Sequence, residues 1–167
     1  MPTPFVNISR YVLLGTAWTG TAPGPAVATP EGTITSTSDI SPFLVGGPDP
    51  TWNAAMVDVT NFGSLGYSQV IPGITSGDDL VFECNSDWAA SQLGSIVRTT
   101  LGGIARPGSS PIYCDIKPTS AARGATNPSF VAACYIKQWT AVSGSVGSKA
   151  AAKLTLTITG TFIDLVA

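Results

Sequence analysis

The sequence predicts a mainly β protein, an antiparallel β-sandwich or half-barrel with one flanking α-helix. Two observations lead to this fold class. Several segments alternate apolar and polar residues with the period of two that a half-buried strand requires, and one segment, residues 87–101, repeats its apolar residues with the period of a helix. The 167 residues suffice for one substantial core and are few for two, so we expect residues 1–167 to form a single domain.

The N-terminal part of the chain begins with a strand and then loses its regular pattern. Residues 6–18 form the first expected strand. Residues 19–50 follow as a long loop, because six of the thirteen prolines lie there among Gly, Ser and Thr, with room for a short strand near residues 33–37. Phe43 and Leu44 are too apolar for an inert linker, so we expect part of this loop to dock on another surface.

A second strand, residues 54–60, leads into a second long loop at residues 61–73. This loop contains the turn formers Gly63, Gly66 and Pro72. It also carries four large apolar residues, Phe62, Leu65, Tyr67 and Ile71. An exposed loop of this composition is either a flap over the core or an arm that contacts another chain.

The stretch from residue 74 to residue 103 contains the one helix that the sequence predicts. A strand with one buried face comes first, since Leu80, Phe82 and Cys84 occupy alternate positions. Side-chain oxygens of Asn85, Ser86 and Asp87 can cap the first turn of a helix over residues 87–101. The residues that share one face of that helix are Ala89, Leu93, Ile96, Val97 and Thr100. The pair Gly102 and Gly103 then suits a left-handed C-cap.

The C-terminal part of the chain is expected to form three more strands. Residues 111–117 place Ile112, Cys114 and Ile116 on one side. Residues 130–142 are apolar on both faces, so we expect both faces to be covered. Residues 153–162 alternate cleanly, which predicts a packed face and a wet face. The wet face would carry Thr155, Thr157 and Thr159.

Composition and charge exclude several classes of function. The net charge is −2 with no basic run, which argues against a protein that grips the phosphates of nucleic acid. No apolar stretch is long enough to span a membrane, and the N-terminus lacks the pattern of a signal peptide, so we expect no membrane partner. Only 11% of residues are charged, which favours burial of surface against copies or partners. An uncharged Thr- and Ser-rich surface is an equal alternative.

The sequence contains no constellation for catalysis or metal binding. The chain has no histidine, which removes Ser-His-Asp and Cys-His arrangements and the usual zinc sites. Cys84, Cys114 and Cys134 lie in apolar strand patterns, so buried reduced thiols are expected. The neighbours Asp78 and Asp79 would point to opposite faces of a strand. We therefore expect no enzyme, no cofactor and no metal.

The order of elements in the last two-thirds of the chain is more distinctive than any one motif. It runs from MVDVTN (56–61) through VIPGITSGDDLVFECN (70–85) and the single helix to IYCDIKP (112–118). A final pair of long strands, residues 130–160, is joined by a turn of small residues. This succession resembles the major tail tube proteins of long-tailed bacteriophages, the lambda-like siphoviruses. Residues 19–50 have no counterpart in the resemblance.

The resemblance implies a structural virion protein, located in the tail and assembled in the host cytoplasm. Six copies would close into a hexameric ring by continuing their sheets, and rings would stack into a tail tube, with the helix on the outside. The genome would pass through the lumen during ejection without specific binding, which suits a net-negative chain. The tape-measure protein, the tail terminator and the tail-tip proteins would be the other partners.

Contacts between stacked rings are assigned to the 61–73 loop. The candidates are Phe62, Leu65, Tyr67 and Ile71. Secondary contact candidates are Phe5, Phe43 and Leu44. As an alternative, the loop side chains plug the core of their own monomer. The threonine face of the last strand is open to either side of the tube wall.

Other classes of protein stay open. A tube protein of a contractile secretion system has the same fold and would be separated by its genomic neighbours. A carbohydrate-binding or pilus-type β-sandwich would carry a secretory signal or a donor strand. A hydrolase that uses only acids would need scattered carboxylates to converge, among them Asp58, Asp78, Asp79, Glu83 and Asp115.

Overall fold

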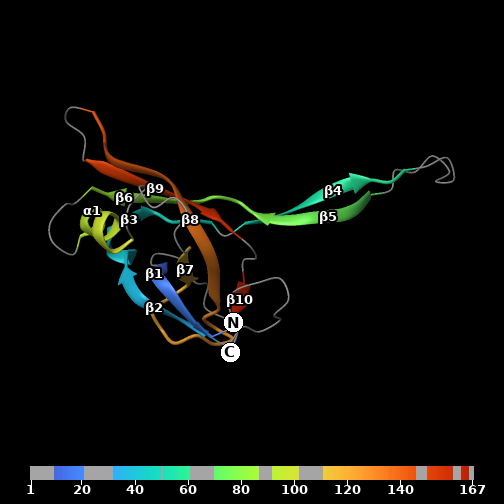
Figure 1. Cartoon of the computed structure of the whole chain (residues 1–167), viewed down its shortest axis with the longest axis horizontal. Coiled ribbons are helices and arrows are strands. Elements are labelled where there is room, and N and C mark those ends of the chain that lie inside the picture. Colours follow the sequence, from blue (N-terminus) through green and yellow to red (C-terminus); the bar gives the residue numbers. More distant parts are fainter. Residues whose placement is uncertain are drawn as a thin grey trace, which may run out of the picture.

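The computed structural model describes residues 10–20, 32–49, 51–60, 70–86, 92–101, 111–145, 150–159 and 163–165. Strands dominate this part of the chain, and every described strand pair is antiparallel, which confirms the predicted fold class (Figure 1). The elements in chain order are β1 (Tyr11–Gly20), β2 (Gly32–Asp39), the 3-10 turn η1 (Ser41–Phe43), β3 (Leu44–Gly46), β4 (Trp52–Asp58), β5 (Val70–Gly77), β6 (Leu80–Asn85), α1 (Leu93–Ser95), the π-helical turn η3 (Ile96–Thr100), β7 (Ile112–Lys117), β8 (Ser129–Ser143), β9 (Ala151–Ile158) and β10 (Ile163–Leu165).

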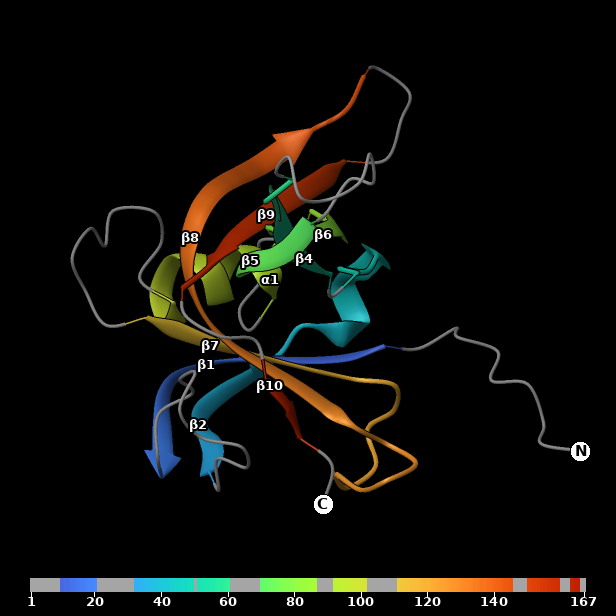
Figure 2. The ribbon, with the colours of Figure 1, turned by 90° about the vertical axis from the view of Figure 1, so that its right-hand side faces the viewer.

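Eight strands form one sheet in the order β2-β1-β7-β8-β9-β6-β3, with β10 also paired to β8. The long β8 joins two parts of this sheet. Its first residues pair with β7, and from Cys134 onward it pairs with β9. β8 curves between these parts (Figure 2). We call β2, β1, β7 and the start of β8 the first half-sheet, and β3, β6, β9 and residues 135–143 of β8 the second half-sheet.

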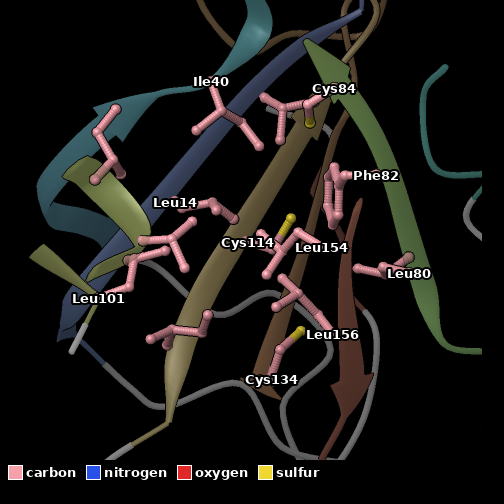
Figure 3. Close-up of a cluster of buried hydrophobic side chains, with 14 of the residues drawn as sticks. Leu14, Ile40, Leu80, Phe82, Cys84, Leu101, Cys114, Cys134, Leu154 and Leu156 are labelled. Carbon is pink, nitrogen blue, oxygen red and sulfur yellow. The ribbon is translucent and has the colours of Figure 1, made fainter. Parts of the chain in front are cut away.

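The core lies between the two half-sheets and the helical turns. Alternate residues of β6, β7 and β9 point into it, as the period-two patterns predict (Figure 3). Phe82, Cys114 and Leu154 are fully buried or nearly so, and the helical turns add Leu93, Val97 and Leu101. All three cysteines are buried and free, which confirms the expected reduced thiols.

The helical segment is shorter than the predicted helix over residues 87–101. Gln92 has an extended backbone with φ −89° and ψ 169°, so α1 begins at Leu93. The N–H of Leu101 donates to the carbonyl of Ile96, five residues back, which makes the second part π-helical. Two of the three expected capping residues belong to the sheet instead. Asn85 is the last residue of β6, and the Ser86 hydroxyl donates a hydrogen bond of 2.9 Å to the Ala141 carbonyl in β8. Residues 87–91 lie outside the described residues.

Neither long loop is a loop throughout. Within residues 19–50 the structure has β2, η1 and β3, so the short strand expected near residues 33–37 is confirmed and is longer than predicted. Within residues 61–73, β5 begins at Val70. β2 pairs with β1, and β5 pairs with β4. These pairings explain why both segments form full strands although their local sequences are rich in turn formers.

Two burial expectations are wrong in part. β8 is largely buried up to Cys134 but largely exposed or half-exposed beyond it, because its pairing with β7 ends there. Thr155 is only 7% exposed, although it lies on the face expected to be wet. Its neighbours across the sheet are Val81 and Gln138, whose larger side chains flank it.

Candidate assembly surfaces

β4 and β5 form a separate two-stranded sheet that projects from the body, and we call it the arm (Figure 1). Four of its large apolar side chains face solvent, with exposed fractions between 47% and 65%. These residues are Met56, Val57, Val70 and Ile71. Val57 and Ile71 lie directly opposite each other in the register. A hairpin alone is marginally stable in water, and exposed apolar patches mark interaction sites, so the arm has the properties of a contact element.

The structure places the predicted contact residues in different settings. Ile71 lies on the arm and is half-exposed. Phe43 and Leu44 are partly buried and pack against the core of the same chain, and their role as secondary contacts stays a prediction. Phe5, Phe62, Leu65 and Tyr67 lie outside the described residues.

The sequence does not single out Met56, Val57 or Val70 as contact residues. For Met56 and Val57 the reason is that residues 54–60 have the pattern of an ordinary strand, and apolar residues in a strand usually pack on their own domain. The available signal was the apolar pair Met56 and Val57, which occupies both faces of a short strand. A strand with apolar residues on both faces needs a packing partner on each face. Among the described residues neither face of this strand has one, since positions 53–60 are all exposed.

The second half-sheet has two free edges within the described strands. β3 is the last strand of the order on one side. On the other side, the register of β7 with β8 ends at Cys134, so residues 135–143 of β8 have β9 as their described sheet neighbour. Tyr135, Val142 and Val45 are large exposed residues at these edges. Free edges are templates for pairing with another chain.

The two faces of the second half-sheet differ in chemistry. The core face carries Phe82 and Leu154 and is covered by the helical turns. The opposite face carries charges that lie close to charges of the other sign. Asp79 forms an ion pair of 2.5 Å with Lys137, and Glu83 is the register neighbour of Lys153. This face is therefore polar and balanced in charge, and we call it the charged face.

The described residues hold no cluster suited to metal chemistry. No group of three His, Cys, Asp or Glu side chains among them could hold a metal ion. Burial raises the pKa of the Cys84 and Cys134 thiols to about 12 and that of Cys114 well above its usual value, so these thiols stay protonated. None of the described helices is long and apolar enough to cross a membrane.

Comparisons with known proteins find likeness in structure alone. No family model matches the sequence, and curated proteins give no match. A chain from the tail of an empty gene transfer agent particle, which has C6 symmetry, matches with a TM-score of 0.55 and 15% identity over 77% of this chain and 85% of that chain. A chain of the SPP1 tail tube matches with a TM-score of 0.57 and 10% identity over 98% of this chain and 80% of that chain.

A third solved structure matches almost end to end. This chain, from the six-fold symmetrised baseplate of the anti-feeding prophage, has a TM-score of 0.58 and 13% identity, over 99% of the present chain and 98% of its own length. At these identities the likeness defines the fold. The chain has the fold of these tail, tail tube and baseplate subunits.

Proposed function

We propose that the protein is the subunit of a bacteriophage-type tail tube, in which copies join into rings, rings stack, and DNA passes along the channel. The observation that carries this proposal is the arm, a hairpin with exposed apolar residues on a body of tail tube fold. Exposure of the apolar side chains of Val57 and Ile71 to water does not stabilise a monomer. Burial of these side chains against another copy is favourable. The low charge density supports extensive contact area as well.

Ring closure uses the two free edges of the second half-sheet. Its strands alternate in direction, so β3 and β8 run in opposite directions. β3 of one copy can therefore pair antiparallel with residues 135–143 of β8 in the next copy, and the half-sheets continue into a closed barrel. The tail and baseplate structures with six-fold symmetry support six copies in a ring.

The charged face of the second half-sheet lines the channel in this proposal. The core, the helical turns and the first half-sheet all lie on the opposite side of these strands (Figure 2). In a ring of six copies, the core, the helical turns and the first half-sheet have room only on the outer side of the ring of second half-sheets. The lumen would then carry balanced pairs such as Glu83 and Lys153, so that DNA slides past without being held.

The arm makes the stacking contacts between rings. Val57 and Ile71 on its strands contribute, together with the candidates Phe62, Leu65 and Tyr67 in the segment that joins β4 to β5. This contact is heterologous and repeats from ring to ring, which is the geometry that produces a filament.

A second candidate is the tube subunit of a contractile secretion system. The end-to-end match to a chain of the anti-feeding prophage baseplate favours it. The two candidates share rings, stacking and a channel, and they differ in what passes through. The neighbouring genes separate them, since a tape-measure protein beside capsid genes supports the phage tail.

Negative-stain electron microscopy over a concentration series of the purified protein tests the proposal. Rings or hollow filaments that grow with concentration are expected. The same series measured by sedimentation velocity gives the mass of the first assembled species, which should be six times that of the monomer. A protein that stays monomeric over the whole series would contradict the proposed function.

A further inference from the structure

The arm is joined to the body by polar contacts at the start of its first strand and at the end of its second. Before β4, Arg10 forms an ion pair of 2.7 Å with Asp49 and donates a hydrogen bond to the Pro48 carbonyl. After β5, the neighbouring acids Asp78 and Asp79 have different partners. These contacts form the root of the arm, residues 47–49, 51 and 77–79.

Asp78 holds the two sides of the root together. Its carboxylate accepts a hydrogen bond of 2.7 Å from the Asn53 amide, and its N–H donates to the Thr51 carbonyl at 3.2 Å. Asp79 instead contacts the body. Its Oδ2 atom lies 2.5 Å from Lys137 Nζ, and its Oδ1 atom accepts a hydrogen bond of 2.8 Å from the Thr157 hydroxyl. Both oxygens of Asp79 are therefore held by residues of β8 and β9.

Lys137 lies at an irregularity in β8. Ile136 lies opposite Leu156 and Gln138 lies opposite Thr155, so Lys137 is the extra residue of a β-bulge. A bulge bends the strand. Alternation from Ile136 on the core face already directs Lys137 to the charged face, and the bulge places Gln138 on that face as well, opposite Thr155. From this position the Lys137 side chain reaches Asp79 at the root of the arm.

Close packing adds to the polar contacts. A Cβ atom built on Gly77 would lie 2.7 Å from Ile158 Cδ1, so the last residue of β5 lies flush against β9. The root is thus fixed from two directions, by packing under Gly77 and by charge at Asp79. Exposed ion pairs contribute little to folding, and Lys137 is 59% exposed, so a role in global stability does not account for the arrangement.

We propose that Lys137, Asp79 and Thr157 form a clamp that sets the direction of the arm relative to the body, and that Lys137 and Asp79 are positioning residues for assembly. The part that concerns assembly rests on the proposed function, because an arm that must meet another copy needs a fixed direction. The clamp itself is a property of the single chain and can be measured there.

Distances between spin labels on the monomer test the clamp directly. One label is placed on the arm by Met56→Cys and one on the body by Ser120→Cys, and the native thiols are buried and stay unlabelled. The unaltered clamp should give a narrow distribution of label distances. Lys137→Met, which removes the charge, should broaden or shift it, while the control Lys153→Met on the same face of the sheet should not.

Two further variants separate geometry from folding. Asp79→Asn should repeat the effect of Lys137→Met, and the exchange of charges in Asp79→Lys with Lys137→Asp should restore the narrow distribution. Circular dichroism and the melting temperature should stay close to those of the parent in every variant. An unchanged distance distribution in Lys137→Met would overturn the clamp, whether or not the protein assembles.

The electron microscopy series then tests the consequence for assembly. Lys137→Met should form fewer filaments than Lys153→Met at equal concentration, or filaments of irregular spacing. Failure of the parent protein to assemble would defeat the proposed function and leave the spin-label result standing. Normal filaments from a variant with a broadened distance distribution would overturn the positioning role.

Discussion

Ser129 donates a hydrogen bond of 2.6 Å to Asp115 Oδ1 and so ties β8 to β7 on the face of the first half-sheet that points away from the core. Burial raises the pKa of the Asp115 carboxyl above its usual 3.8, and the bond from Ser129 and the charges of Lys117 and Arg123 only partly oppose this. Protonated Asp115 is therefore more favourable in the folded protein than in the unfolded chain.

The raised pKa of Asp115 predicts a loss of stability with rising pH. Its contribution is fully present below the usual pKa of 3.8 and is lost as the pH rises through the higher pKa of the folded state. Asp115→Asn stays neutral and keeps an acceptor for Ser129, so it should be the more stable protein at neutral pH. Urea unfolding of both proteins at several pH values measures this. A stability difference that does not grow with pH would contradict it.

Gly15 in β1 should not tolerate a side chain. A Cβ atom there would lie 2.8 Å from the Thr35 carbonyl oxygen in β2 and still closer to the Ile34 side chain. The carbonyl oxygen belongs to the backbone of a paired strand and cannot move away by a change of rotamer. Gly15→Ala should therefore lower the free energy of unfolding by about 1–3 kcal/mol. The matched control is Gly124→Ala, since a Cβ atom at Gly124 meets nothing within 4 Å. Equal urea midpoints for the two variants would count against the β1–β2 packing.

Asn127 should be essential to the connection between β7 and β8. Its side chain is buried, accepts hydrogen bonds from the N–H and hydroxyl of Thr119, and donates to the Ala121 carbonyl at 2.9 Å. Asn127→Ala removes these hydrogen bonds and leaves the N–H of the half-buried Thr119 without its partner, which should cost about 1–3 kcal/mol of unfolding free energy. The exposed neighbour Thr126 provides the control, because Thr126→Ala should change stability by less than about 0.5 kcal/mol. Similar losses in both would refute the role of Asn127.

Charges on the arm should block assembly without unfolding the chain. Val57 and Ile71 lie opposite each other and are exposed, so Val57→Asp with Ile71→Asp removes apolar contact area and places carboxylates in the proposed interface. Sedimentation velocity should then show monomer at concentrations where the parent assembles. The control Ser120→Asp with Thr126→Asp adds the same charge to an exposed loop and should assemble. Assembly by the arm variant would remove the arm from the interface.

The parts of the fold that the sequence predicts well are those in which burial is decided locally. In β6 and β7, alternate residues such as Phe82 and Cys114 are buried, because one face of each strand packs on the core along its whole length. The end of β8 differs, since its exposure depends on where β7 stops, which no local pattern records. β2, with its run of Thr and Ser, is a strand because β1 lies beside it.

The sequence indicates the candidate site only in part, for the same reason. Ile71 stands out as an apolar residue among turn formers, whereas Met56 and Val57 resemble the buried residues of any strand. Their exposure follows from the position of the arm outside the main sheet. The bond between Lys137 and Asp79 joins residues 58 positions apart, so neither residue alone indicates it.

A cryo-electron microscopy reconstruction of the assembled protein would show whether the subunits form the proposed tube. We expect a hollow tube with six copies in each ring, β3 beside residues 135–143 of the next copy, and Glu83 and Lys153 directed toward the channel. A filament without a channel, or a tube whose inner wall is formed by the first half-sheet, would contradict it.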